Sequence, residues 1–200
     1  RRPRSRVFFA PRTGPSHPVS MSGAKFLAEN EENGDHNQYW YSTFTIDRMV
    51  EDCVNLKGRI GFLSVPSIYF ALPDDVRAEA FCFDFDKKWE SDRGFVFYDF
   101  NDLQTLPAEL HGTFDVLVVD PPFIVHEVWE KYAAAVKLLL KPEGKLILTT
   151  VIENAEMLHK HMGVTPTAFQ PSIPNLVYQY NLFTNYESTV FCKRNPEIPE

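Results

Sequence analysis

The stretch Val116-Leu117-Val118-Val119-Asp120-Pro121-Pro122-Phe123 determines the fold that we expect for this chain. Its first four residues are a continuous apolar run, which is typical of a strand buried on both faces of a parallel sheet. The two prolines fix the backbone φ angle and remove two N–H donors, while their carbonyl groups stay free to accept hydrogen bonds. Asp120 adds a carboxylate, and Phe123 adds a flat apolar face. Such a corner can accept hydrogen bonds from an NH₂ group and stack on the molecule that carries it.

Short apolar strands alternate with helices on both sides of this stretch. Continuous or alternating apolar residues predict the strands Ile60–Val65, Ala80–Phe85, Phe95–Tyr98, Asp115–Val119 and Lys145–Val151. Apolar residues at helical spacing predict the helices Ile46–Leu56, with Thr45 as its N-cap, His126–Leu140 and Glu153–Met162. The segment Val164–Lys193 is interpreted as two or three strands, with Tyr178–Thr184 and Ser188–Lys193 paired antiparallel. The pattern predicts a doubly wound, Rossmann-like α/β domain with a mostly parallel sheet and an antiparallel C-terminal strand.

The N-terminal part of the chain differs from the rest. Residues 1–20 are rich in Arg, Pro and Ser, lack periodicity and hold five arginines and no acid. We expect a disordered tail over residues 1–37 and one domain over residues 38–200. Without the five arginines the formal charge of −7 becomes −12, so the body of the protein is acidic. An acidic body repels phosphate backbones and attracts basic partners, which favours a basic protein as partner and disfavours nucleic acid.

Several classes of protein are disfavoured by what the sequence lacks. No apolar run approaches the length of a membrane span, so no membrane partner is expected. Cys53, Cys82 and Cys192 are odd in number and widely spaced, which fits buried thiols in a reducing compartment, and we expect the cytoplasm. His159 and His161 diverge on a helix without a third ligand, so no metal site is expected. No G-x-x-x-x-G-K-[ST] loop is present, which argues against an ATPase.

Polar residues follow several predicted strands, at the edge where doubly wound sheets bind their ligands. These segments are Ser64-Val65-Pro66-Ser67, Asp84-Phe85-Asp86, Asp99-Phe100 and Asp120-Pro121-Pro122-Phe123. A carboxylate at the end of the second strand is placed to accept hydrogen bonds from ribose hydroxyls, and we favour Asp84 over Asp86 for this role. The alternative for these two residues is a surface acid pair beside two lysines.

The central segment and five others carry a resemblance to known enzymes. Asp120-Pro121-Pro122-Phe123 matches the [DNS]-P-P-[YFW] motif of amino-methyltransferases, which include the adenine amino-methyltransferases of DNA. A closer resemblance covers Gln38 to about Lys193, and is carried by Gln38-Tyr39-Trp40-Tyr41-Ser42, Ser64-Val65-Pro66-Ser67-Ile68-Tyr69, Asp84-Phe85-Asp86, Phe97-Tyr98-Asp99-Phe100-Asn101 and Phe183-Thr184-Asn185-Tyr186. These segments resemble a eukaryotic family first labelled as putative adenine methyltransferases, whose studied members methylate a lysine of translation elongation factor 1-alpha.

The resemblance implies a methyltransferase that uses S-adenosylmethionine. It implies that Asp120, Pro121, Pro122 and Phe123 are catalytic, and that the cofactor lies against Ser64, Pro66, Ser67, Asp84, Asp86, Asp99 and Phe100, with Asp99 near the adenine amino group. Asp99 can equally be a turn residue. Ser64-Val65-Pro66-Ser67 departs from the glycine-rich loop that methyltransferases usually carry after their first strand, and the closer family shares this departure.

Aromatic residues before the first predicted helix suggest a wall around the substrate amine. Tyr39, Trp40 and Tyr41 are consecutive in a non-periodic stretch, so they are either part of the pocket or the packing surface of an N-terminal arm. Asn185 and Tyr186 are expected to border the same pocket.

The sequence therefore supports three functions. The first is a protein-lysine methyltransferase acting on elongation factor 1-alpha. The second is an adenine methyltransferase acting on DNA or RNA, which would need a basic groove or recognition module that this acidic chain does not show. The third is a non-catalytic binding module of the same fold.

Overall fold

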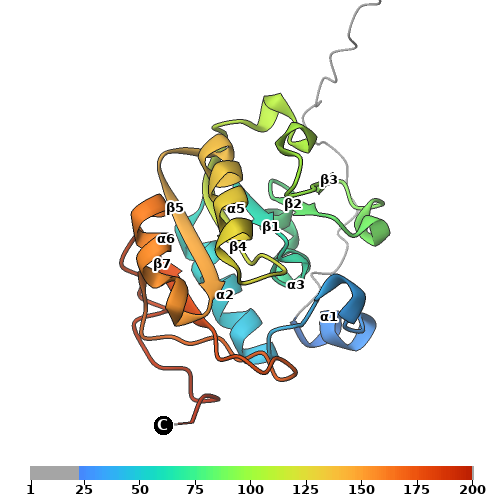
Figure 1. The fold of residues 1–200 in the computed structure, drawn as a ribbon. Helices are drawn as coiled ribbons and strands as arrows, with labels where there is room; N and C mark the ends of the chain where they lie inside the picture. Colours follow the sequence, from blue (N-terminus) through green and yellow to red (C-terminus); the bar gives the residue numbers. More distant parts are fainter. Residues whose placement is uncertain (1–22, 200) are drawn as a thin grey trace, which may run out of the picture.

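The computed structural model describes residues 23–199 (Figure 1). Five strands are parallel: β1 (Ile60–Leu63), β2 (Phe81–Asp84), β3 (Phe95–Phe97), β4 (Phe114–Val119) and β5 (Leu140–Thr150). Strand β7 (Asn181–Thr184) pairs antiparallel with β5, and β6 (Thr165–Pro166) pairs antiparallel with β7. The strand order is β3-β2-β1-β4-β5-β7-β6. The predicted Rossmann-like α/β fold, with its mostly parallel sheet and antiparallel C-terminal strands, is confirmed.

Helices cover both faces of the sheet. On one face α1 (Gly23–Glu29), α2 (Thr43–Leu56) and α3 (Pro66–Ala71) pack together, and on the other lie α5 (His126–Leu139) and α6 (Ala155–Met162). A single turn, α4 (Asp74–Arg77), connects α3 to β2. Because side chains alternate along a strand, Phe62 belongs to the first core and Leu63 to the second. The strands are therefore apolar on both faces, as the continuous apolar runs indicate.

The predicted helices are present with small shifts at their ends. Helix α2 begins at Thr43, three residues before the predicted start, because Ser42 is its N-cap: the Ser42 hydroxyl accepts a hydrogen bond from the backbone N–H of Thr45, 3.1 Å away. Helix α6 ends at Gly163, whose φ of 68° terminates it in the left-handed conformation.

The expected disorder of residues 1–37 is wrong from Gly23 onward. The side chain of Phe26 in α1 is fully buried, and its ring packs edge-on against Trp40 with centroids 5.1 Å apart. Phe26 thus contributes to the first core, and the segment that carries it belongs to the folded domain. Residues 1–22, the remainder of the predicted tail, lie outside the described residues.

The C-terminal strands also differ from the prediction. The segment Ser188–Lys193 is a turn and forms no strand. The Ser188 hydroxyl accepts hydrogen bonds from the N–H groups of Val190 and Phe191, both 3.0 Å away, and this local bonding replaces a ladder with β7. The partner of β7 is instead β6, a strand of only two residues.

The strand order identifies where a ligand binds. The chain runs from β1 outward to β2 and β3 on one side, then returns to place β4 and β5 on the other side. In open sheets of this type the crevice lies at the carboxyl ends of the two strands where the order reverses, here β1 and β4. Among residues 23–199 no helix is long and apolar enough to cross a membrane.

Candidate active site

A pocket of about 320 Å³ opens at the carboxyl ends of β1, β2, β3 and β4. The N-terminal segment that precedes α2 forms its opposite wall. The structure brings to this pocket all the predicted catalytic and cofactor-binding residues and the three N-terminal aromatics: Tyr39, Trp40, Tyr41, Ser64, Pro66, Ser67, Asp84, Asp86, Asp99, Phe100, Asp120, Pro121, Pro122 and Phe123. Segments far apart in the sequence therefore meet at one place, as the sheet rule predicts.

Asp120 lies directly after β4 and is partly buried. Its Oδ2 atom accepts a hydrogen bond from the Tyr41 hydroxyl, 2.5 Å away. Burial raises the pKa of Asp120 to about 7, and hydrogen bonds from Tyr41 and Thr149 act against this rise. The carboxylate is thus held in a place where its charge is costly unless a ligand supplies hydrogen bonds or positive charge.

The two proline carbonyls have different environments. The Pro122 carbonyl accepts a hydrogen bond from the side-chain amide of Asn37, so the expectation that both carbonyls are free is wrong for this one. Within residues 23–199 the Pro121 carbonyl has no hydrogen-bond donor. Two consecutive residues of the pocket lining, Asp120 and Pro121, can therefore accept hydrogen bonds from an amine. Phe123 is 47% exposed, which leaves its ring available at the pocket.

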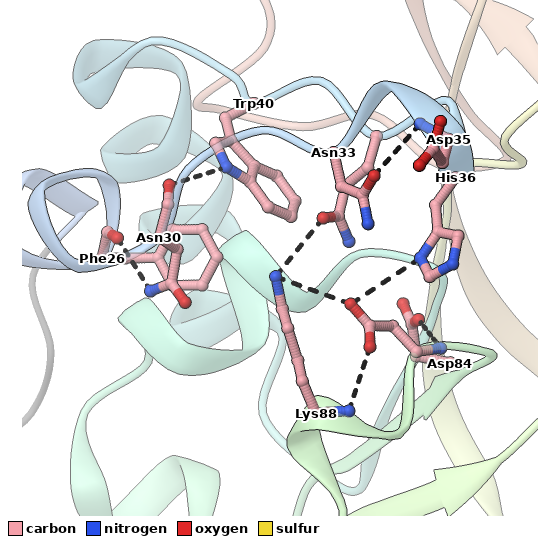
Figure 2. Close-up of polar contacts among 10 residues, drawn as sticks. Phe26, Asn30, Asn33, Asp35, His36, Trp40, Asp84 and Lys88 are labelled. Atoms are coloured by element: carbon pink, nitrogen blue, oxygen red, sulfur yellow. Dashed lines mark hydrogen bonds and ion pairs between the residues drawn. The ribbon is translucent and has the colours of Figure 1, made fainter.

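Two carboxylates follow β2, and they differ in how they are bound. Oδ1 of Asp84 accepts from the backbone N–H of Asp86, 2.8 Å away, and burial raises the pKa of Asp84 to about 6. Asp86 caps the next turn through the N–H of Lys88 and forms ion pairs with Lys88 and His36, at 3.6 and 3.8 Å. Figure 2 shows the side chains of His36, Lys88 and Asp84 close together. The Asp86 carboxylate is therefore bound by groups of the protein itself. Among the described residues only Oδ1 of Asp84 accepts a hydrogen bond, which leaves Oδ2 for a ligand.

The turn after β1 is made without glycine. Ser64 adopts a φ of 58°, in the left-handed region that glycine normally supplies. Its hydroxyl lies 2.6 Å from the hydroxyl of Tyr132 on α5, and this contact holds the strained residue in place. Pro66 then occupies the first turn of α3, where a missing N–H costs nothing. The departure from a glycine-rich loop thus preserves the shape of the turn.

The end of β3 supplies Tyr98, Asp99 and Phe100. The Tyr98 side chain is buried, and its hydroxyl has no hydrogen-bond partner among the described residues. Because a buried hydroxyl without a partner is unfavourable, this group beside the pocket fits a polar ligand. The Asp99 carboxylate accepts from the N–H of Asn101, 2.8 Å away, so it forms the turn that was its alternative role while also lining the pocket.

Asn185 and Tyr186 do not border the pocket, and this prediction is wrong. The Asn185 side chain accepts from the N–H of Leu146 and donates to the Gly144 carbonyl, which ties the end of β7 to β5. The Tyr186 hydroxyl donates to Asp52 on α2. Both residues stabilise the antiparallel edge of the sheet, away from the carboxyl ends of the parallel strands.

The sequence interpretation missed several pocket residues. Asp35, His36 and Asn37 lie in the segment that was expected to be disordered, and Tyr98, Tyr132 and Tyr180 were not singled out. Tyr132 has the helical spacing of a core residue and is indeed buried, so only its hydroxyl contact with Ser64 shows its place at the site. Among residues 23–199 no group of three or more His, Cys, Asp or Glu is arranged to hold a metal ion.

The family described as "Probable N6-adenine methyltransferase" matches this chain over residues 32–188. The chain is 31% identical to the "EEF1A lysine methyltransferase 1" of Homo sapiens over 81% of this chain and 78% of that protein. It is 34% identical to the protein of the same name from Danio rerio, over 76% of this chain and 97% of that one.

Solved structures agree on the fold. A branched-chain polyamine synthase from Thermus thermophilus matches with a TM-score of 0.60 at 12% identity, over 83% of this chain and 63% of that chain. A "Precorrin-6y C5,15-methyltransferase" from Geobacter metallireducens matches with a TM-score of 0.52 at 12% identity, over 86% and 100%.

The family match and the relatives define a methyltransferase. Its sequence places it more narrowly. The chain belongs to the family described as probable N6-adenine methyltransferases, and it is similar to the EEF1A lysine methyltransferase 1 proteins over most of its length.

Proposed function

We propose that this enzyme transfers a methyl group from S-adenosylmethionine to the side-chain nitrogen of a lysine in elongation factor 1-alpha (EEF1A). The observation that carries the proposal is the partly buried Asp120 carboxylate next to Pro121, whose carbonyl has no hydrogen-bond donor among residues 23–199, in a chain that is 31% identical to EEF1A lysine methyltransferase 1. Asp120 and Pro121 can both accept hydrogen bonds from an amine, and the names of the relatives favour the amine of a lysine in EEF1A.

The residues at the other end of the pocket fit the cofactor. Asp84 keeps one carboxylate oxygen for ribose hydroxyls, and Tyr98 offers a buried hydroxyl that lacks a partner within the described residues. Ser64, whose φ is 58°, turns the chain after β1 and lines the pocket together with Val65, Pro66 and Ser67. When bound, S-adenosylmethionine supplies an electrophilic methyl carbon on a positively charged sulfur.

The chain's own residues then have three tasks. They must hold the acceptor nitrogen in line with the methyl group, exclude water and favour loss of a proton from the lysine ammonium. Asp120 and Pro121 orient the N–H hydrogens. The aromatic side chains of Tyr39, Tyr41 and Phe123 surround the amine and reduce its hydration, which lowers the pKa of a lysine and favours the neutral, nucleophilic form. Since a free lysine has a pKa about three above neutral pH, the neutral form otherwise costs roughly 4 kcal/mol.

The acidic charge of the enzyme outside the pocket favours a substrate protein with a basic surface. The chain carries a formal charge of −7, and the only arginine cluster falls in residues 1–20. An acidic surface favours association with a basic protein and disfavours a nucleic acid. The described cysteines are free thiols, which supports a reducing compartment, and the cytoplasm stays our prediction.

A competition experiment tests the proposal. Isotope-labelled S-adenosylmethionine, purified EEF1A, and adenine-containing DNA and RNA are mixed with the enzyme in one tube, and products are separated by protease and nuclease digestion. We expect label only in the protease-sensitive product. Label in the nucleic acid, with none in EEF1A, would establish the adenine methyltransferase instead, and label in neither would contradict the proposed substrate.

A further inference from the structure

Tyr41 belongs to the N-terminal segment, yet its side chain reaches the floor of the pocket and contacts the central carboxylate. Its hydroxyl oxygen lies 2.5 Å from Oδ2 of Asp120 and 2.6 Å from Oγ1 of Thr149 on β5. Tyr41 is 2% exposed and Thr149 is 1% exposed, and Asp120 is partly buried at the pocket. We propose that Tyr41 is a positioning residue for methyl transfer, whose hydroxyl group orients the Asp120 carboxylate and stabilises its charged form. The inference rests on the proposed function, because it assigns Tyr41 a part in that reaction.

The charged carboxylate fixes the direction of the Tyr41 hydrogen bond. A carboxylate has no hydrogen to give, so the single hydroxyl hydrogen of Tyr41 points at Asp120. The Thr149 hydroxyl lies 2.6 Å from the Tyr41 oxygen, and its hydrogen bond also lowers the pKa of Asp120. The three groups form one cluster in which each hydrogen bond strengthens the others.

Both sequence neighbours hold Tyr41 in place. The indole Nε1 of Trp40 donates to the Asn30 carbonyl, 3.0 Å away, and the Trp40 ring packs on Phe26. On the other side the N–H of Ser42 donates to the Ser172 carbonyl, 2.8 Å away, and the Ser42 hydroxyl caps α2. Because the residues on both sides of Tyr41 are fixed, its side chain loses little conformational freedom when its hydroxyl binds the carboxylate. A positioning residue requires such a fixed geometry.

The Tyr41 hydroxyl also lowers the pKa of Asp120. Burial raises the pKa of Asp120 to about 7, and the hydrogen bond from Tyr41 is the largest contribution that lowers it. The titratable groups that face Asp120 are Tyr41, Tyr132 from α5 and Tyr180 before β7, and the pKa of each is raised, chiefly by burial. All three are therefore neutral at neutral pH. If the Tyr41 hydroxyl were removed, neither of the two remaining tyrosines would supply a positive charge to stabilise the Asp120 carboxylate.

The test compares Tyr41→Phe with Tyr186→Phe. Both changes remove one hydroxyl that donates to an aspartate, but the partner of Tyr186 is Asp52 on α2, outside the pocket. The pKa of Asp120 is measured by NMR titration of protein with ¹³C-carboxyl-labelled aspartate, and its signal is identified by its loss in Asp120→Asn. The pH profiles of kcat and KM are measured for both variants with the same EEF1A substrate, and circular dichroism checks their folding.

We expect Tyr41→Phe to raise the pKa of Asp120 by roughly one to two, the effect of one hydrogen bond to a charged group. It should lower kcat at neutral pH on the order of tenfold to a hundredfold, with little change in the KM for EEF1A. The acidic limb of the profile should move to higher pH, so that raising the pH recovers part of the lost rate. Because the pH profile of kcat/KM reports the free enzyme and the free substrate, and free EEF1A is the same in all assays, a shift of this profile between the variants reports the enzyme alone. Tyr186→Phe should change none of these quantities.

Two results would overturn the inference: an unchanged pKa of Asp120 in Tyr41→Phe, or the same loss of kcat in both variants at every pH. The NMR titration needs no substrate. If the wild-type enzyme transferred no methyl group to EEF1A, the proposed function would fail, while the titration would still decide whether Tyr41 controls Asp120.

Discussion

Oδ1 of Asp84 accepts a hydrogen bond from the backbone N–H of Asp86, 2.8 Å away. The bond fixes the Asp84 carboxylate at the end of β2, with its second oxygen available to the pocket. Asp86 has its own partners in Lys88 and His36. Two acids separated by a single residue therefore have different roles, one toward the ligand and one within the loop.

This difference predicts unequal effects on cofactor binding. Asp84→Asn should weaken the affinity for S-adenosylhomocysteine by roughly tenfold to a hundredfold, because it removes a charged acceptor from the ribose hydroxyls. Asp86→Asn should have a much smaller effect, since asparagine is also a good N-cap for the following turn. Isothermal titration calorimetry measures both. Since the pKa of Asp84 is about 6, wild-type affinity should also fall as the pH drops below that value. Equal losses in the two variants would remove Asp84 from this role.

The N-terminal helix should contribute to global stability. The side chain of Phe26 is fully buried in the first core, so Phe26→Ala should lower the free energy of unfolding by about 3–5 kcal/mol. Val54→Ala is the control, because Val54 is 36% exposed on α2 and its truncation should cost about 0.5 kcal/mol or less. Urea denaturation followed by circular dichroism gives both values. If Phe26→Ala unfolded at the same urea concentration as the control, α1 would not be part of the cooperative domain.

Asp120 should reduce stability at alkaline pH. Its pKa is raised from 3.8 to about 7 in the folded protein, so between these two values the folded state holds a proton that the unfolded state has lost. The free energy of unfolding from this group therefore falls as the pH rises from 4 to 7, by on the order of 4 kcal/mol at most.

The neutral variant Asp120→Asn avoids that loss. We expect its Tm to exceed the wild-type Tm at pH 8 and to match it near pH 4, while its methyl transfer is abolished. Thermal melts at a series of pH values provide the comparison. A Tm difference that stayed constant with pH would show that the charge of Asp120 is not the source of the instability.

The sequence alone predicted the sheet and most of the pocket, and the reason is physical. Apolar runs such as Val116–Val119 identify strands buried on both faces, and the polar residues that follow parallel strands must meet at one edge. The contact of Tyr41 with Asp120 could not be predicted, because it joins residues that are 79 positions apart and depends on how the N-terminal segment folds back.

The wrong predictions have two different causes. Asn185 and Tyr186 follow a strand end and resemble the family, but β7 is antiparallel, so its end points away from the carboxyl ends of the parallel strands. Asp35–Asn37 are polar and lie near a tail, so composition suggested disorder. Their order comes from tertiary contacts, such as that of His36 with Asp86, which no local pattern encodes.

The central claim is tested most directly by mass spectrometry of purified, unmethylated EEF1A after incubation with S-adenosylmethionine and this enzyme. The control is Asp120→Ala, first shown by calorimetry to bind S-adenosylhomocysteine with near wild-type affinity. We predict a methylated lysine in one EEF1A peptide with the wild-type enzyme and none with Asp120→Ala. An unmodified EEF1A with the wild-type enzyme, or equal methylation by both enzymes, would contradict it.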